Sequence, residues 1–133
     1  MKKIAFFDID GTLTSEIDGS IPVSAIEAIR AARANGNLMF INTGRCFQNV
    51  EERFRSIGFD GLVCGCGTNI YCEDREILHV SQTHDVTMEL LKAAQDADLD
   101  ILFESYKEVT FDRSRPLHDS EAIKLYRQFA SFD

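Results

Sequence analysis

The fold is decided by the stretch IAFFDIDGT, residues 4–12. Its first four residues are apolar and partly aromatic or β-branched, which is typical of a buried strand, and Gly11 breaks the run. Ligands of open α/β sheets bind just beyond the carboxyl ends of the strands, so a site is predicted where this strand ends. Residues i and i+2 of a strand point to the same side, and we therefore expect Asp8 and Asp10 to face that site together.

Two carboxylates this close, Asp8 and Asp10, repel each other unless a cation lies between them or one of them is protonated. One interpretation is a hard, oxygen-preferring cation such as Mg²⁺. Another is that one carboxylate is a nucleophile and the other carries protons. A purely structural role is disfavoured, because placing two carboxylates at the end of an apolar strand costs free energy.

Length, composition and charge exclude several classes of protein. The 133 residues, of which 44% are hydrophobic, are enough for a modest domain with a core. The net charge of −8 argues against a general affinity for nucleic acid or anionic membranes. The first apolar run is too short for a signal peptide, and no segment approaches the ~18 apolar residues of a membrane span. We expect a cytoplasmic protein with no nucleic-acid or membrane partner.

The four cysteines leave two interpretations open. Cys64 and Cys66 would share a face of a strand, which suits a soft metal, but the C-x-x-C spacing is absent. No histidine is nearby in the sequence, so reduced cysteines that pack as small apolar residues are favoured.

The hydrophobic pattern predicts alternating strands and helices over the first 67 residues. Pro22 and the capping box Ser24-x-x-Glu27 are predicted to begin the first helix. Apolar residues at helical spacing predict a second helix from Phe47 to Ile57. The predicted strands are 4–7, 38–41 and 62–64, and the predicted helices are 22–34 and 47–57. This β-α-β-α-β order predicts a parallel sheet with crossover helices.

The pattern changes after this unit. It predicts a β-hairpin, a helix capped by Asp85, an antiparallel pair of strands and a final helix. These elements are 69–72 with 77–80, 86–97, 99–104 with 108–111, and 120–130. The sequence thus predicts an α/β unit over residues 1–82 and an α+β unit over 83–133.

Two motifs resemble those of a known superfamily. FFDIDGTLT, residues 6–14, resembles the first motif of the haloacid dehalogenase-like hydrolases, and NTGR, residues 42–45, resembles their second. The order of these motifs, with a Pro-initiated helix between them and a Gly-rich strand end and hairpin after them, resembles the Cof-type sugar-phosphatase branch. The resemblance implies a Rossmann-like parallel sheet, the N-terminal half of that core, followed by an incomplete α+β cap.

The resemblance also implies roles for the two aspartates. Asp8 would attack phosphorus and form an aspartyl-phosphate, while Asp10 would protonate the leaving alcohol and later activate water. Mg²⁺ would bind the Asp8 side chain and the Asp10 carbonyl. The implied activity is Mg²⁺-dependent hydrolysis of small phosphorylated metabolites, with sugar phosphates favoured.

The remaining site residues follow from the second motif and the first loop. Thr43 and Gly44, together with Gly11, are expected to hold the phosphoryl oxygens. Arg45 has two interpretations with equal weight: it steers an anionic substrate, or it pairs with a surface carboxylate.

The sequence departs from the family pattern in ways that keep a second hypothesis open. The 133 residues contain no Gly-Asp-x-x-Asn-Asp motif, and none of the lysines follows a predicted core strand. The family's Asn-Gly-Ala is replaced by Cys64-Gly65-Cys66. We therefore expect a portion of a longer hydrolase, or a chain that self-associates through an exposed sheet edge. The alternative function is an incomplete fragment or phosphate-binding module without turnover; a phospho-accepting receiver domain is disfavoured by Asp-x-Asp-Gly-Thr.

Overall fold

The structure, a computed structural model, describes residues 1–73, 75–105, 108–118 and 123–124. Its chain forms two compact units, Met1–Val80 and Ser81–Asp133, and each is described by itself. The predicted division into residues 1–82 and 83–133, with the second part as a cap, stays a prediction.

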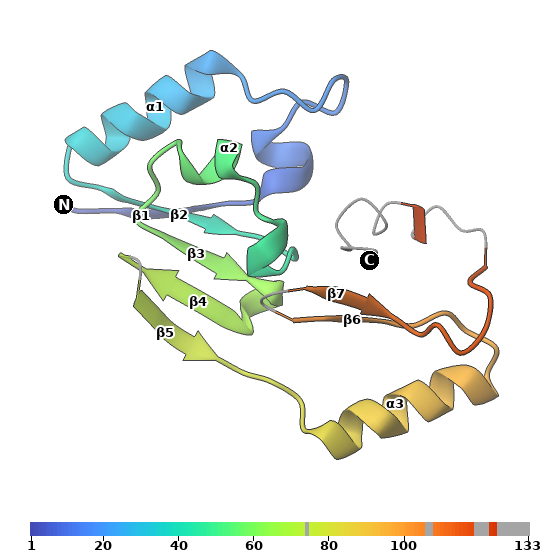
Figure 1. Ribbon diagram of the computed structural model, residues 1–133. Coiled ribbons are helices and arrows are strands. Elements are labelled where there is room, and N and C mark those ends of the chain that lie inside the picture. Colours follow the sequence, from blue (N-terminus) through green and yellow to red (C-terminus); the bar gives the residue numbers. More distant parts are fainter. Residues whose placement is uncertain (74, 106–107, 119–122, 125–133) are drawn as a thin grey trace. The chain divides into compact units, whose positions relative to one another are not determined.

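Among its described residues, the first unit holds a five-stranded sheet whose strands lie in chain order (Figure 1). The strands are β1 (Ile4–Phe7), β2 (Leu38–Asn42), β3 (Gly61–Cys64), β4 (Asn69–Cys72) and β5 (Arg75–His79). The first three are parallel, and β4 and β5 are antiparallel to their neighbours. The predicted α/β class and the predicted hairpin are thus confirmed, with β5 beginning two residues earlier than expected.

Helices α1 (Val23–Ala34) and α2 (Glu52–Arg55) connect the parallel strands and lie on the same face of the sheet (Figure 1). Two right-handed crossovers that step in the same direction along a sheet place their helices on one face. The predicted capping box is wrong, because Ser24 lies inside α1 and Pro22 occupies the cap. The Pro22 carbonyl instead accepts the free N–H groups of Ala25 and Ile26, at 3.0 and 3.3 Å.

The predicted continuous helix from 47 to 57 is also wrong. A 3₁₀ turn (Phe47–Asn49) is separated from α2 by extended backbone at Val50 and Glu51, with ψ of 98° and 153°. Side chains take the carbonyls that a continuous helix would use. The Arg55 guanidinium donates to the Phe47 carbonyl at 2.7 Å, and that of Arg45 to the Asn49 carbonyl at 3.2 Å. The apolar residues at helical spacing lie in the core or pack against it, as the pattern indicated. The pattern does not indicate which donors bond to the backbone carbonyls.

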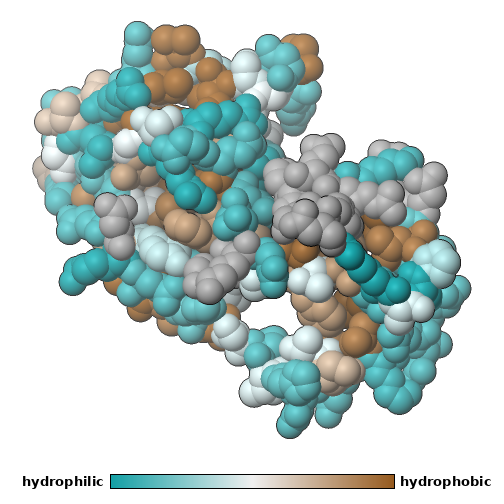
Figure 2. All heavy atoms as spheres, viewed as in Figure 1, coloured by the Kyte–Doolittle hydropathy of each residue, from teal (hydrophilic) through white to brown (hydrophobic). Residues whose placement is uncertain are grey.

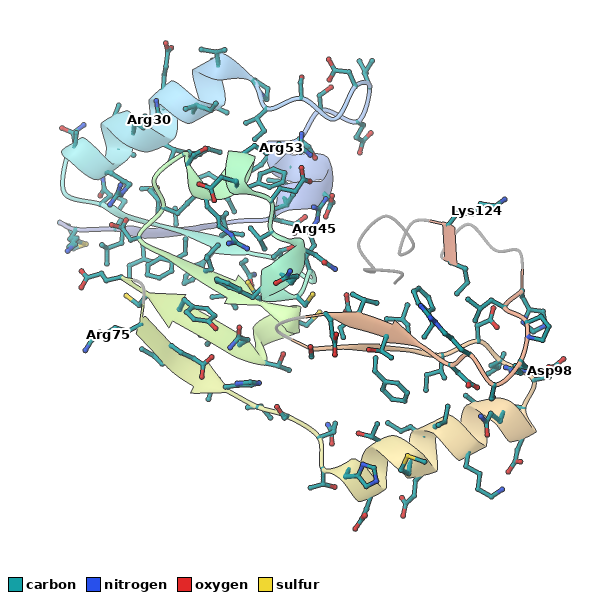
Figure 3. All side chains as sticks on the ribbon, viewed as in Figure 1. Arg30, Arg45, Arg53, Arg75, Asp98 and Lys124 are labelled. Carbon is teal, nitrogen blue, oxygen red and sulfur yellow. The ribbon has the colours of Figure 1, made fainter. Side chains whose placement is uncertain are left out.

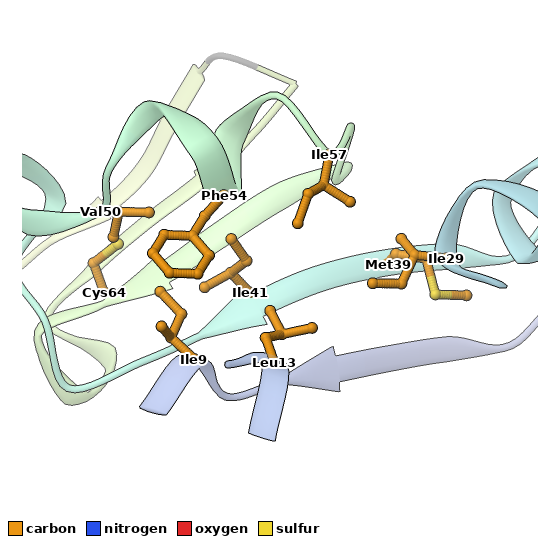
Figure 4. Packing of buried hydrophobic residues seen from close by; sticks show 9 residues of the cluster. All are labelled: Ile9, Leu13, Ile29, Met39, Ile41, Val50, Phe54, Ile57 and Cys64. Carbon is orange, nitrogen blue, oxygen red and sulfur yellow. The ribbon is translucent and has the colours of Figure 1, made fainter. Parts of the chain in front are cut away.

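The core of the first unit lies between the sheet and these helices (Figure 4). Phe54 from α2 and Ile41 from β2 are fully buried, and Ile9 from the loop after β1 joins them. The cluster consists of Ile9, Leu13, Ile29, Met39, Ile41, Val50, Phe54, Ile57 and Cys64. Because Ile9 is anchored in this core, the loop that carries the two aspartates is held against the ends of the strands.

The opposite face of the sheet carries apolar side chains that solvent reaches. Ile4 and Phe6 of β1 are 58% and 57% exposed, and the Phe6 ring lies 5.5 Å from that of Phe40 on β2. Figure 2 shows brown, hydrophobic spheres among teal ones at the surface of the molecule. β1 is an edge strand of this sheet, and self-association through that edge stays a prediction.

Gly61 of β3 is required by a close approach between strands. A Cβ there would lie 2.3 Å from the Tyr71 carbonyl oxygen and 2.5 Å from a ring carbon of Phe40, so both would have to move. We expect Gly61→Ala to lower the free energy of unfolding by about 1–3 kcal/mol, as overpacking does in cores. Urea denaturation measures this, with Gly44→Ala as the control, because a Cβ there meets only the Cys66 sulfur at 3.6 Å. Equal stability of the two variants would contradict the prediction.

The second unit contains helix α3 (His84–Asp96) and an antiparallel pair, β6 (Leu102–Glu104) and β7 (Val109–Phe111), as predicted. Its predicted cap is wrong: the Thr83 side chain, not Asp85, accepts the Val86 N–H. The threonine hydroxyl reaches this N–H because Thr83 keeps an extended backbone just before the first turn. Apart from residues 123–124, the helix predicted over 120–130 lies outside the described residues.

Across the ranges that the structure describes, none of the helices combines the length and the apolar character needed to span a membrane.

Candidate active site

The predicted site residues follow the carboxyl ends of neighbouring parallel strands. Phe7 pairs with Ile41 in the sheet, so Asp8 and Thr43 lie just beyond the ends of adjacent strands. Asn42 pairs with Val63, which places the loop after β3 beside the loop after β2. In open α/β sheets this edge is where ligands bind.

The loop after β1 turns sharply through the two aspartates. β1 ends at Phe7, and Gly11 has a φ of +74°, a conformation that side chains with a Cβ disfavour. Asp8 and Asp10 therefore lie beyond the strand itself, and their shared orientation toward a site stays a prediction. Ile9 between them is buried, and both aspartates are exposed to solvent.

The loop after β2 is held by backbone hydrogen bonds to the loop after β3. Thr43 is 3% exposed; its N–H donates to the Val63 carbonyl at 2.9 Å, and its carbonyl accepts the Cys66 N–H at 3.3 Å. The Gly65 N–H donates to the Arg45 carbonyl at 2.8 Å. The Thr43 hydroxyl accepts the Arg45 N–H at 3.2 Å and is thereby oriented. Gly44, between them, is exposed.

Arg45 joins the two motifs, and its side chain is labelled in Figure 3. Its Nη2 and Nε donate to the two carboxylate oxygens of Asp10, at 2.6 and 2.9 Å. Its Nη1 donates to Glu51 Oε1 and to the Asn49 carbonyl, each at 3.2 Å. Of the two interpretations of Arg45, pairing with a carboxylate is the one seen, and the partner is itself a predicted site residue.

Glu51 is a member of this cluster that sequence reasoning missed. It also pairs with Arg53, at 2.8 Å. It follows Arg45 by six residues, a spacing that carries no regular-helix signal, and it comes near only because the chain bends at Val50 and Glu51.

The Arg45 guanidinium, mainly through its hydrogen bonds, holds the pKa of the Asp10 carboxyl below its usual value, against the opposing effect of partial burial. Its pairing with Asp10 in turn raises the pKa of Arg45. In this arrangement Asp10 is a carboxylate at neutral pH. Because its folded pKa is lowered, the stability that the pair contributes is present at neutral pH and lost as pH falls through that pKa.

We expect Arg45→Gln to move the pKa of Asp10 upward, toward that of a free aspartate. A pH titration of the carboxyl carbon by nuclear magnetic resonance measures this change. Arg53→Gln is the matched control, because Arg53 acts on Asp10 only through a weaker coulombic effect. An unchanged Asp10 titration in Arg45→Gln, or equal shifts in both variants, would contradict the assignment.

The residues present fit a hard metal ion only in part. The Asp8 carboxylate is an exposed oxygen donor, whereas the Asp10 carboxylate faces Arg45. In the described portion of the chain, no cluster of three or more His, Cys, Asp or Glu side chains is arranged to hold a metal. Of these two side chains, only the Asp8 carboxylate is therefore open to a hard cation, and water would have to complete the shell of such an ion.

Comparison with known proteins decides the family. A family model for haloacid dehalogenase-like hydrolases matches residues 5–133. The chain belongs to the haloacid dehalogenase-like hydrolase family. A phosphoglycolate phosphatase from Staphylothermus marinus is 30% identical over 138 residues, covering 100% of this chain and 53% of that protein.

Solved structures that resemble this chain agree with the fold. A hypothetical protein from Geobacillus kaustophilus has a TM-score of 0.81 and 26% identity, over 98% of this chain and 50% of its own. The subclass IIB sugar phosphatase BT4131 has a TM-score of 0.71 and 27% identity, over 84% of this chain and 44% of its own. The resemblance drawn from residues 6–14 and 42–45 is thus confirmed. The chain spans about half the length of these relatives.

Proposed function

We propose that this chain carries the nucleophile and phosphate-binding loop of a phosphoric monoester hydrolase. One observation carries the proposal: the exposed Asp8 and the buried Thr43 follow adjacent parallel strands, and Arg45 links the Thr43 loop to Asp10. A haloacid dehalogenase-like hydrolase with this arrangement has a nucleophile, a phosphate loop and a proton carrier within two short loops.

In the proposed reaction, a carboxylate oxygen of Asp8 attacks phosphorus. The bond from phosphorus to the ester oxygen breaks, and Asp10, when protonated, gives its proton to the leaving alkoxide. Asp10, now a carboxylate, takes a proton from water, which attacks the phosphorus of the aspartyl-phosphate. Phosphate leaves, Asp8 is regenerated, and Asp10 holds the proton again.

Arg45 acts differently on the two halves of this cycle. Its hydrogen bonds favour the ionised Asp10, which is the form that activates water in the second half. The first half needs the protonated form, so the Arg45–Asp10 contact must loosen when a phosphate ester binds. An anionic substrate supplies a competing partner for the Arg45 guanidinium, which is how the two interpretations of Arg45 are reconciled.

The remaining groups bind and neutralise the phosphoryl oxygens. Thr43 would donate its hydroxyl hydrogen, and the Gly44 and Gly11 backbone would line the same oxygens. Asp8 and the Asp10 carbonyl would hold Mg²⁺, whose charge, when it is bound, offsets the charge of the phosphoryl oxygens.

The proposed substrates are small phosphorylated metabolites. One relative is named a phosphoglycolate phosphatase and another a sugar phosphatase, and among such esters we favour sugar phosphates. We further propose that residues 83–133 are part of a cap that selects the substrate. The competing function is phosphate binding without turnover, which the absence of a metal-binding side-chain cluster in the described residues favours.

Phosphate release from a panel of esters tests the proposal. The panel holds phosphoglycolate, several hexose phosphates and an aryl phosphate, each assayed with Mg²⁺ and with a chelator. Turnover that requires Mg²⁺ supports the hydrolase. Binding of phosphate by calorimetry without turnover of any ester would favour the binding module, and neither binding nor turnover would overturn both.

A further inference from the structure

A cavity of about 650 Å³ lies in the first unit, apart from the candidate active site. Its volume falls within the range of about 300–1,000 Å³ that small-molecule sites occupy. Asp60 and Gly61 line it at the start of β3, and Tyr71 lines it near the end of the antiparallel β4. The cavity is therefore nearer the amino end of β3, whereas Asp8 and Thr43 follow carboxyl ends, and none of the proposed catalytic residues lines it.

Apolar and aromatic side chains form part of the lining of this cavity. Leu62 on β3 and Tyr71 on β4 are directly opposite each other, so their side chains lie on the same face of the sheet. This is the face that packs on the core, because Leu62 contacts the core cluster. The Phe47 ring lies 4.4 Å from the Tyr71 ring, centroid to centroid. The Arg55 guanidinium lies 4.4 Å from the centroid of the Phe47 ring. Phe47 thus contacts the Arg55 guanidinium and the Tyr71 ring, and these flat groups suit a planar ligand.

The two arginines that line the cavity differ in whether a carboxylate pairs with them. Arg33 and Asp60 neutralise each other through two hydrogen bonds, of 2.7 and 3.1 Å. Arg55 donates to the Phe47 carbonyl at 2.7 Å, and its Nε is buried without a hydrogen-bond partner. Within the described ranges, no carboxylate forms an ion pair with Arg55. Because no described carboxylate neutralises the Arg55 guanidinium, an anion in the cavity beside it is favoured.

We propose that this cavity binds an aromatic carboxylate. The carboxylate would accept hydrogen bonds from the terminal nitrogens of the Arg55 guanidinium, because Nε is enclosed by protein. The ring would lie against Phe47 and Tyr71, over Leu62. Glu73, which also lines the cavity, disfavours a second negative charge and so selects a monoanion. This inference does not depend on the proposed phosphatase activity, because no phosphate and no residue of that site takes part.

Indole-3-acetate and its neutral amide, indole-3-acetamide, form a matched pair of probes for the 133-residue chain. Backbone amide shifts in nitrogen-15 spectra report both the affinity and the place of binding. We expect indole-3-acetate to shift the amides of Gly61, Leu62 and Tyr71, and to bind about tenfold more tightly than the amide, which corresponds to one charge-assisted hydrogen bond.

Two substitutions on α2 test whether the Arg55 guanidinium itself binds the carboxylate, or whether losing any positive charge on this helix weakens binding. Arg55→Gln is expected to weaken indole-3-acetate binding about tenfold. Arg53→Gln, two residues away but directed at Glu51 and the Gly19 carbonyl, is expected to leave it within about twofold. If Arg55→Gln fails to fold, the comparison of acid and amide on the unmodified chain still decides. No binding, equal binding of acid and amide, or shifts centred on the Asp8 and Thr43 loops would each overturn the proposal.

Discussion

Asp8→Asn is expected to lower phosphate release by about 10³-fold or more, the loss typical of removing a nucleophile. The amide oxygen is neutral and a poor nucleophile, and the substitution also removes the exposed carboxylate proposed as a metal ligand. Asparagine has nearly the same shape and Asp8 is exposed, so the fold should be kept. Phosphate release is the first measurement.

If the chain releases phosphate too slowly to measure, a second experiment tests Asp8 as the nucleophile. Beryllium fluoride forms an adduct on an aspartate carboxylate that mimics an acyl phosphate, and fluorine resonance detects it. We expect the adduct in the unmodified chain and none in Asp8→Asn. Asp18→Asn is the matched control, because Asp18 is also an exposed loop aspartate, and it accepts hydrogen bonds from Ser20 of its own loop. An adduct that survives in Asp8→Asn would exclude Asp8 as the nucleophile.

Phe54→Ala is expected to reduce the free energy of unfolding of the first unit by about 3–5 kcal/mol. Phe54 is fully buried between the sheet and the loop after β1, so its removal leaves a cavity in the middle of the core. Its ring also lies beneath Arg45, whose guanidinium carbon is 5.6 Å from the ring centroid. The contact of Arg45 with Asp10 should therefore loosen as well.

Urea denaturation measures the stability change, and the Asp10 titration measures the loosening. Val23→Ala is the control, since Val23 lies at the start of α1 with 69% of its surface exposed, and a change within about 0.5 kcal/mol is expected. Loss of less than about 1 kcal/mol in Phe54→Ala would show that the core does not depend on this ring.

Local pattern was enough to predict most of the first unit. The apolar runs of β1, β2 and β3 differ in composition from the polar loops between them, and the burial of Met39, Ile41 and Cys64 shows that these runs form the core. The parallel order followed from the crossover lengths. Where prediction was wrong, at the cap of α1 and between Phe47 and α2, the outcome depended on which donors compete for a few backbone carbonyls.

In the candidate site too, some features were predictable from local sequence and others were not. Asp8, Asp10, Thr43 and Gly44 were recognisable because they follow strand-like runs, and a strand end is a local feature. The pairing of Arg45 with Asp10 joins residues 35 positions apart, and the contact of Arg45 with Glu51 needs the bend that ends the 3₁₀ turn. Neither contact has a local signature.

By itself, the sequence determined the family, the α/β class and the identity of the strand-end residues, because these depend on residue type and spacing along the chain. The tertiary structure alone decided that Arg45 holds Asp10 as a carboxylate, and that Arg55 is left with a buried, unsatisfied nitrogen beside a cavity. Both outcomes depend on which donor reaches which acceptor after the elements have packed. The distance between a donor and an acceptor far apart in the sequence is set by the whole fold.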